Sequence, residues 1–184
     1  MLLTIDTAQA INNELSRFDI LALEKAIIKE TNNHFRLSDA SNPIKAVDRD
    51  GTIHITGNNF VQVGDTVEVS GIDYISDIYH VKEVGEGYIK VCTQKPLRPV
   101  ETNLNGALYI VSFPYEIQKG AEGILKYLKT AGTGAAGGAI RAKSVGRVRV
   151  EYATDVTSGT QHHIYGAPAH LWGFLEPYRR LRWA

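Results

Sequence analysis

Cysteine and long apolar runs are the two features that this sequence has least of. The chain of 184 residues contains a single cysteine, Cys92. One thiol cannot form an intrachain disulfide or supply a cysteine-based zinc cluster. No uninterrupted run of about 18 apolar residues occurs, so we predict no membrane-spanning helix. The first residues also lack the basic start and the long apolar stretch of a secretory signal, so we expect a chain without a membrane anchor that is made in the cytoplasm and is kept there or built into something assembled there.

The sequence also has no excess charge of either sign. Its 20 Lys and Arg residues balance its 20 Asp and Glu residues, which argues against a strongly basic nucleic-acid-binding protein and against an acidic disordered tail. The balance hides a gradient, because residues 1–101 hold 15 acids and 10 bases, whereas residues 102–184 hold 5 acids and 10 bases. Two interpretations stay open: chance, or a polar subunit whose acidic part meets the basic part of a neighbouring copy.

The first 37 residues have helical spacing. Asp6 is the expected N-cap of a short helix that ends near Leu15, and Asp19 is the expected N-cap of a second helix. We expect Glu24 and Lys29 on the outer surface of the second helix. Its apolar residues recur near a helical period: Ile20, Leu23, Ile27 and Ile28.

Residues 44–113 change to the two-residue alternation of β-strands. Short alternating runs are separated by turns that contain glycine, asparagine or aspartate. Five to seven such strands indicate a small antiparallel barrel or sandwich. Proline and small polar residues at 38–43 predict a turn before it. Because helical spacing resumes after residue 113, we interpret 44–113 as an insertion in a helical domain made of residues 1–43 and 114–184.

A third helix is predicted to begin at Pro114, which suits the first helical position. The glycine-rich run 132–139 follows that helix, and residues 140–153 then alternate as one long strand, which suits a hairpin or an exposed arm. Pro168 is expected to start a last helix, and Pro177 to end or kink it. The predicted fold class is therefore α+β: a small helical bundle with a long β-hairpin or strand arm and an inserted antiparallel β-barrel or sandwich.

No pattern in the sequence predicts a catalytic, cofactor or metal site. The glycine-rich run lacks the Gly-Lys-Ser/Thr ending of a phosphate-binding loop. His162 and His163 are adjacent, and adjacent strand side chains point to opposite faces, so the pair suits no single metal ion. Ser144 and Ser158 lack a nucleophile elbow, and we expect Cys92 to be a buried apolar residue. We predict no enzymatic activity and no cofactor.

The C-terminus combines aromatic residues with arginines, the residue types that dominate the hot spots of protein–protein interfaces. The alternative is a terminal helix that packs on its own core and ends in solvated charges. We interpret seven residues as a docking surface: Trp172, Phe174, Tyr178, Arg179, Arg180, Arg182 and Trp183. The strand 140–153 carries basic residues suited to an inter-subunit arm: Arg141, Lys143, Arg147 and Arg149.

Binding of single-stranded nucleic acid is an alternative function. The barrel and the basic C-terminal tail would contact the phosphates, and Tyr74, Tyr79 and Tyr88 would stack on the bases. Residues 44–113 nevertheless hold nine acids and six bases, which opposes a phosphate-binding groove on the barrel.

The order of the segments resembles a known family. A helix pair is followed by PYEIQKGAEGILKYLKT, a glycine-rich gap, IRAKSVGRVRVEYA and a closing LWGFLEPYRRLRW. The chain resembles the head–tail connector proteins of tailed bacteriophages, also called adaptor or head-completion proteins. The resemblance covers roughly residues 1–37 and 114–182, and it depends on the order of these short motifs. The β-rich residues 44–113 depart from the compact helical bundle of that family.

The resemblance implies a structural, non-enzymatic protein of the virion neck. Proteins of this family form a homo-oligomeric ring, typically of twelve subunits, beneath the portal protein at the capsid vertex. The ring extends the DNA channel, through which DNA passes without sequence-specific binding, and offers a platform to the next tail-completion protein. We expect the C-terminal segment to dock on the portal, where its arginines would meet carboxylates, or to face the channel DNA.

Overall fold

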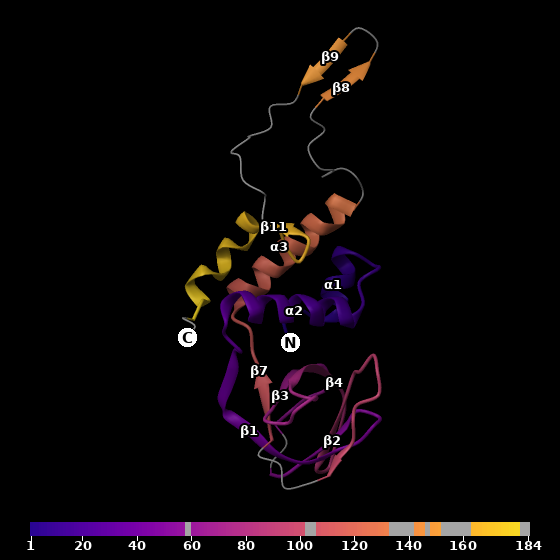
Figure 1. The fold of residues 1–184 in the computed structure, drawn as a ribbon, viewed down its shortest axis with the longest axis vertical. Helices are drawn as coiled ribbons and strands as arrows, with labels where there is room; N and C mark the ends of the chain where they lie inside the picture. Colours follow the sequence, from indigo (N-terminus) through magenta and orange to yellow (C-terminus); the bar gives the residue numbers. More distant parts are fainter. Residues whose placement is uncertain (58–59, 102–105, 133–141, 146–147, 152–162, 181–184) are drawn as a thin grey trace.

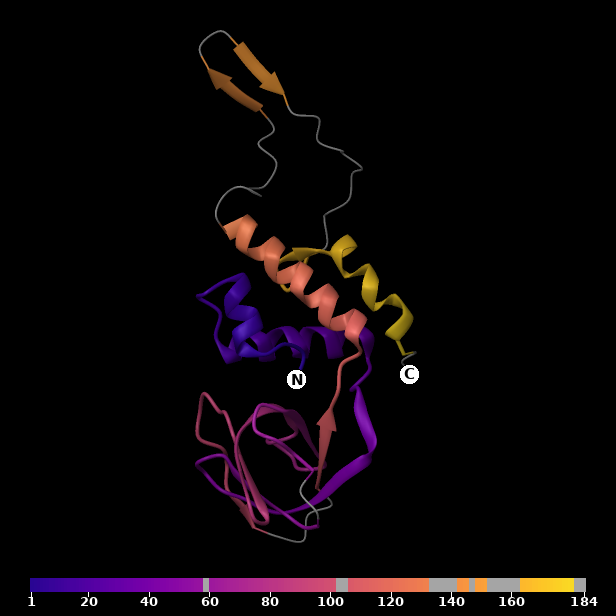
Figure 2. The same ribbon diagram turned by 180° about the vertical axis from the view of Figure 1, so that it is seen from behind.

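The computed structural model describes residues 1–57, 60–101, 106–132, 142–145, 148–151 and 163–180. The fold class is α+β, as predicted. A seven-stranded antiparallel sheet occupies one end of the molecule, four helices occupy the middle, and a short β-hairpin lies at the other end (Figures 1 and 2).

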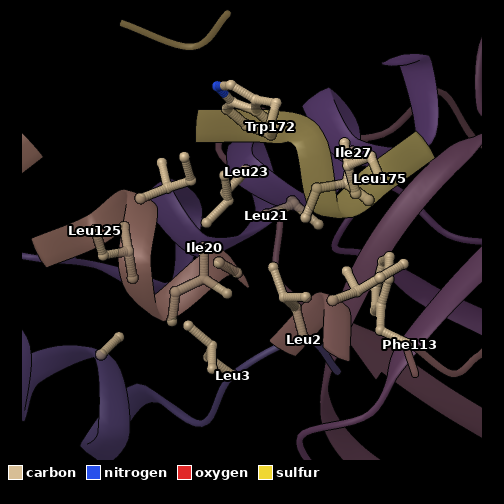
Figure 3. Close-up of a cluster of buried hydrophobic side chains, with 14 of the residues drawn as sticks. Leu2, Leu3, Ile20, Leu21, Leu23, Ile27, Phe113, Leu125, Trp172 and Leu175 are labelled. Carbon is tan, nitrogen blue, oxygen red and sulfur yellow. The ribbon is translucent and has the colours of Figure 1, made fainter. Parts of the chain in front are cut away.

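The helical part consists of α1 (Ile5–Ile11), α2 (Arg17–Thr31), α3 (Tyr115–Gly132) and the 3-10 helix η1 (Ala169–Tyr178). Helix α2 lies across the end of the sheet, and α3 and η1 lie on the far side of α2 (Figures 1 and 2). The four helices and the first residues of the chain enclose one apolar core, part of which is shown in Figure 3. Its best buried members include Leu2, Leu23, Ile27, Ile117, Trp172 and Leu175.

The N-caps of the first two helices differ from the sequence prediction. Thr4 caps α1, because its side chain accepts a hydrogen bond from the Thr7 amide at 3.1 Å. Ser16 caps α2 and forms a capping box with Asp19, whose Oδ2 accepts from the Ser16 amide at 2.8 Å. The prediction of Asp6 and Asp19 as N-caps was therefore wrong, since both carboxylates belong to the first helical turn. There they complement the positive end of the helix dipole.

The predictions for the later helices are largely confirmed. Helix α3 begins directly after Pro114, and its apolar stripe is buried or packed against the core: Ile117, Ala121, Ile124, Leu125 and Leu128. The last helix begins after Pro168 as expected, but it is a 3-10 helix. Pro177 lies in the last turn of η1, which ends at the next residue, Tyr178, close to the predicted end.

The sheet contains β1 (Arg36–Val47), β2 (Thr52–Ile55), β3 (Thr66–Ser70), β4 (Asp77–Gly85), β5 (Tyr88–Val91), β6 (Val100–Glu101) and β7 (Ala107–Val111). Its strand order is β2-β5-β4-β3-β7-β1-β6, and every pairing is antiparallel. A further pairing of β1 with β2 closes the sheet, so the predicted barrel forms. Fully buried residues fill it, among them Val47, Ile53, Val67, Val81, Ile89 and Leu108.

Strand β1 contradicts the predicted turn at 38–43. The strand runs through these residues and pairs first with β7 and then with β2 and β6. Its register shifts between Arg36 and Ser41 and again between Ile44 and Ala46. Such irregularities bend a strand, which lets β1 belong to both sides of the barrel. The barrel therefore begins at Arg36 and includes residues that the sequence assigned to the helical domain.

Of the two arrangements predicted for residues 140–153, a hairpin or a strand arm, the structure has the hairpin, made of β8 (Ala142–Val145) and β9 (Val148–Glu151). The two strands pair antiparallel, with Val145 opposite Val148. A second small pair consists of β10 (His163–Ile164) and β11 (Ala167–Pro168), which lead into η1. None of the helices that the structure describes has both the length and the apolar character that crossing a lipid bilayer requires.

Candidate functional site

A buried polar cluster joins the helices to the barrel. The carboxylate of Glu24 on α2 lies 2.8 Å from Nε2 of His80 on β4 and accepts a hydrogen bond from Oγ1 of Thr66 on β3 at 2.9 Å. Oε1 of Glu24 also accepts from the amide of Leu2 at 2.6 Å. Three separate segments of the chain therefore meet at one carboxylate of α2.

The cluster has no room for a substrate. Glu24 is 0% exposed and His80 is 2% exposed. The hollow beside His80 is lined by Met1, Ile5, Arg17, Ile20 and Gly64 and has a volume of about 40 Å³, which admits about one water molecule. We therefore assign the cluster to the packing of α2 on the barrel.

Sequence reasoning placed Glu24 on the outer surface of its helix, and this was wrong. Position 24 lies four residues after Ile20 and three before Ile27, so it belongs to the apolar stripe of α2. That spacing is the feature of the sequence that could have predicted the burial of Glu24. A carboxylate is tolerated there because the barrel supplies the donors that a buried charge requires.

A second polar cluster lies at the start of β1. Arg36 binds Glu68 through two hydrogen bonds, Nε to Oε2 at 2.7 Å and Nη2 to Oε1 at 2.6 Å. His34 adds its Nδ1 at 2.9 Å from Oε1 of Glu68, and the Arg36 guanidinium lies 4.3 Å from the centre of the Tyr109 ring. The hydrogen bonds to Glu68 raise the pKa of Arg36. This bidentate pair fixes the geometry between β1 and β3.

The C-terminal docking surface predicted from sequence divides into buried and exposed residues. Trp172 is 1% exposed and belongs to the core of its own chain, so it offers no surface to a partner (Figure 3). Phe174 and Tyr178 are half-buried against the same core. Arg179 and Arg180 are exposed. Arg182 and Trp183 lie outside the described residues.

Hydrogen bonds hold the end of η1 against the other helices. The Arg180 amide donates to the Thr31 carbonyl at 2.8 Å, and Oη of Tyr178 lies 3.1 Å from Oε2 of Glu116. The guanidinium of Arg179 forms an ion pair with Glu176 at 2.9 Å. The C-terminal segment therefore presents Arg179 and Arg180 from a fixed backbone position beside the end of α2.

The predicted basic arm coincides only partly with the described residues. Lys143 lies on β8 opposite Val150, and Arg149 lies on β9 opposite Ser144, so these two basic residues are not cross-strand neighbours. Arg141 and Arg147 lie outside the described residues.

The described residues contain no group of three or more His, Cys, Asp or Glu side chains that could hold a metal ion. His170 is exposed. His162 and Ser158 lie outside the described part of the chain. Cys92 was predicted to be buried, but it is only partly buried. Its Sγ lies 3.9 Å from Nη1 of Arg17.

The comparisons with known proteins add no relative: no protein-family model matches the chain, and no curated protein matches it significantly.

The three tyrosines considered for base stacking lie in different surroundings. Tyr79 is buried and donates to the Ile75 carbonyl, and burial raises its pKa to about 12. Tyr74 is 86% exposed, and Arg98 lies 5.2 Å from its ring centre. Tyr88 is half-buried, and its hydroxyl donates to Glu83. Tyr79 is therefore not available for stacking.

Proposed function

We propose that the chain is a structural, non-enzymatic subunit of a ring between the portal protein and the tail of a tailed bacteriophage. In this role it would assemble with copies of itself, dock on the portal and receive the next tail-completion protein in the neck of the virion. DNA would pass through the channel of the ring without sequence-specific contacts. The support from sequence is the order of motifs that resembles the head–tail connector family.

The observation that carries the proposal is the exposed arginine pair at the end of η1. Arg179 and Arg180 follow Phe174 and Tyr178, which are half-buried, and the segment is held to α2 by the Arg180–Thr31 backbone hydrogen bond. Arginines next to partly exposed aromatic rings are typical of protein-binding surfaces. Their position on a fixed backbone lowers the entropy that docking would cost.

The charge gradient along the sequence supports assembly into a ring. A ring subunit has two different contact surfaces that meet on neighbouring copies. The net charges of −5 for residues 1–101 and +5 for residues 102–184 would favour such head-to-tail contacts over contacts between like surfaces. The nucleic-acid alternative has less support, because Tyr79 is buried.

The test is attachment to portal-bearing capsids. The double variant Arg179→Gln/Arg180→Gln is expected to bind these particles at least about tenfold more weakly than the parent chain, which corresponds to about 1.4 kcal/mol. The matched control is Arg49→Gln/Arg98→Gln, which removes two exposed arginines of the barrel region. Equal binding by both variants would contradict the docking surface, and absence of the protein from purified virions would contradict the function.

A further inference from the structure

A row of neighbouring hollows runs along α2, where this helix crosses the barrel. Three hollows of about 440, 420 and 560 Å³ follow one another along it. The first and second share Lys25, Asp77 and Ile78, and the second and third share Phe18 and Cys92. We call this feature the α2 groove.

One face of α2 forms the helical wall of the groove. Phe18, Lys25 and Lys29 line it in this order, separated by seven and four residues, which places them on one side of the helix. The α2 residues that line the groove run from Arg17 to Lys29, so this wall is about 18 Å long. That length accommodates about five or six residues of an extended peptide.

The α2 groove is basic in a part of the chain that is acidic. Residues 1–101 carry 15 acids and 10 bases, but seven of those bases and only three of those acids line the groove. The excess of positive charge in the groove is therefore opposite in sign to the net charge of its surroundings. The seven bases are Arg17, Lys25, Lys29, Arg36, Lys82, Lys90 and Lys95.

The three acids are already engaged within the chain. Asp77 pairs with Lys25 at 2.5 Å, Asp50 pairs with Lys90 at 2.6 Å, and Glu68 holds Arg36. Three exposed cations of the groove have no carboxylate partner among the described residues: Arg17, Lys82 and Lys95. The groove therefore has positive charge available for an external anion.

The floor of the groove is apolar. Leu21, Ile78 and Leu97 line the middle hollow together with Phe18. The Phe18 ring is half-buried and belongs to neither apolar core of the molecule. Apolar side chains of a bound peptide would pack on such a floor.

We infer that the α2 groove binds an extended acidic peptide segment of a partner protein, with apolar side chains on the floor and carboxylates on Arg17, Lys82 and Lys95. The charge complementarity of the groove selects this occupant. The Lys25–Asp77 ion pair crosses the groove between the first and second hollows, and both side chains are nearly half exposed. A carboxylate of the bound segment would exchange with Asp77 on Lys25. The binding does not require that the chain form a ring.

The probe is a fluorescein-labelled peptide of alternating aspartate and leucine, titrated with the full-length chain and followed by anisotropy. We expect saturable binding that weakens as salt is added. A peptide of alternating aspartate and serine tests the apolar floor and should bind more weakly, and a peptide of alternating lysine and leucine should not bind. Oligothymidylate of similar length tests the nucleic-acid alternative.

The variant Arg17→Glu/Lys82→Glu/Lys95→Glu should bind the aspartate–leucine peptide at least about tenfold more weakly than the parent chain. The control Lys45→Glu/Arg49→Glu/Arg98→Glu reverses the three bases of residues 1–101 that lie outside the groove and should keep most of the affinity. All six side chains are exposed, so both variants are expected to fold, which circular dichroism checks. No saturable peptide binding, equal losses in both variants, or binding of oligothymidylate alone would each overturn the inference.

Discussion

Some single residues at the contact between α2 and the barrel connect several segments of the chain. Glu24 is the clearest example, because its carboxylate accepts hydrogen bonds from the N-terminal segment and β3 and lies against His80 of β4. Removing one member of a buried polar cluster destabilises a protein strongly, because the groups that remain are buried without a partner. The stability of the whole fold should therefore be sensitive to this position.

We predict that Glu24→Ala lowers the free energy of unfolding by about 3–5 kcal/mol, because the Leu2 amide, Thr66 and His80 lose a shared acceptor in a buried site. Urea denaturation followed by circular dichroism measures the change. The control Glu14→Ala removes an exposed carboxylate and should change the stability by less than about 0.5 kcal/mol. If both substitutions change the free energy of unfolding by less than about 0.5 kcal/mol, the buried cluster does not stabilise the contact between α2 and the barrel.

Asp50 provides a prediction about pH. The Lys90 ammonium donates to Asp50 at 2.6 Å and, with further hydrogen bonds from Thr52, lowers the pKa of Asp50 from 3.8 to about 2. Since the folded-state pKa is the lower one, the pair stabilises the fold above the ordinary pKa, and this contribution is lost as the pH falls from 3.8 towards 2.

The Asp50 carboxyl carbon, followed by NMR, should therefore titrate near 2 in the parent chain and closer to 3.8 in Lys90→Met. Lys82 lines the same hollow but forms no ion pair with Asp50. The substitution Lys82→Met should therefore leave the titration midpoint of Asp50 near 2. An unchanged midpoint in Lys90→Met would mean that the ion pair does not set this pKa.

At the scale of elements, α3 and η1 meet through a glycine. A Cβ atom at Gly120 would lie 2.4 Å from Cδ2 of Phe174, so the close approach of the two helices requires the missing side chain. Gly123, one turn further along α3, has no neighbour within 4 Å of the corresponding position. The two glycines form a matched pair for mutation.

We predict opposite outcomes for these two glycines. Gly123→Ala should stabilise the chain by about 0.5–1 kcal/mol, because alanine is the better helix former. Gly120→Ala should lose this gain and destabilise the chain by about 1–3 kcal/mol, because it overpacks the contact with Phe174. Thermal unfolding of both variants measures the difference. Stabilisation by both would show that η1 moves away from α3 without penalty.

Elements with strong local patterns were predictable from sequence, and elements defined by distant partners were not. Helix α3 has Pro114 before its first turn and an unbroken apolar stripe, so its position and buried face were predicted correctly. Strand β1 passes through Pro43 and several small polar residues whose local preference is for a turn. Pairing with β7, β2 and β6 overrides that preference, and no local pattern contains this information.

The same distinction applies to the candidate surfaces. The aromatic and arginine composition at the C-terminus was visible in sequence, but the burial of Trp172 depends on how η1 packs on the other helices. The α2 groove was not predicted, because its bases come from α2, β1, β4, β5 and the segment after β5. Only the folded chain brings them to one place.

At the scale of the whole molecule, the barrel and the helices depend on each other. Ile78 and Val111 belong to barrel strands but are buried in the helical core, and Glu24 has two of its partners in the barrel. We therefore expect that the two parts into which the sequence divides the chain do not fold independently.

We predict that a chain in which residues 36–111 are replaced by a short glycine–serine linker does not unfold cooperatively, because Glu24 loses Thr66 and His80 and the helical core loses Ile78 and Val111. Calorimetry of the shortened and full-length chains provides the comparison. Adding Glu24→Leu to the shortened chain should recover part of the helical signal, since it removes the unpaired charge. A sharp calorimetric transition in the shortened chain would contradict this prediction.

The closed barrel and the two-stranded hairpin differ in how another polypeptide can join them. In the barrel, the pairing of β1 with β2 leaves few backbone donors and acceptors free for strand addition. Strands β8 and β9 pair only with each other among the described strands, so the outer backbone of each is open. Copies that associate by extending a sheet would therefore have both outer edges of the hairpin available, whereas the barrel offers little beyond the edge of the two-residue strand β6.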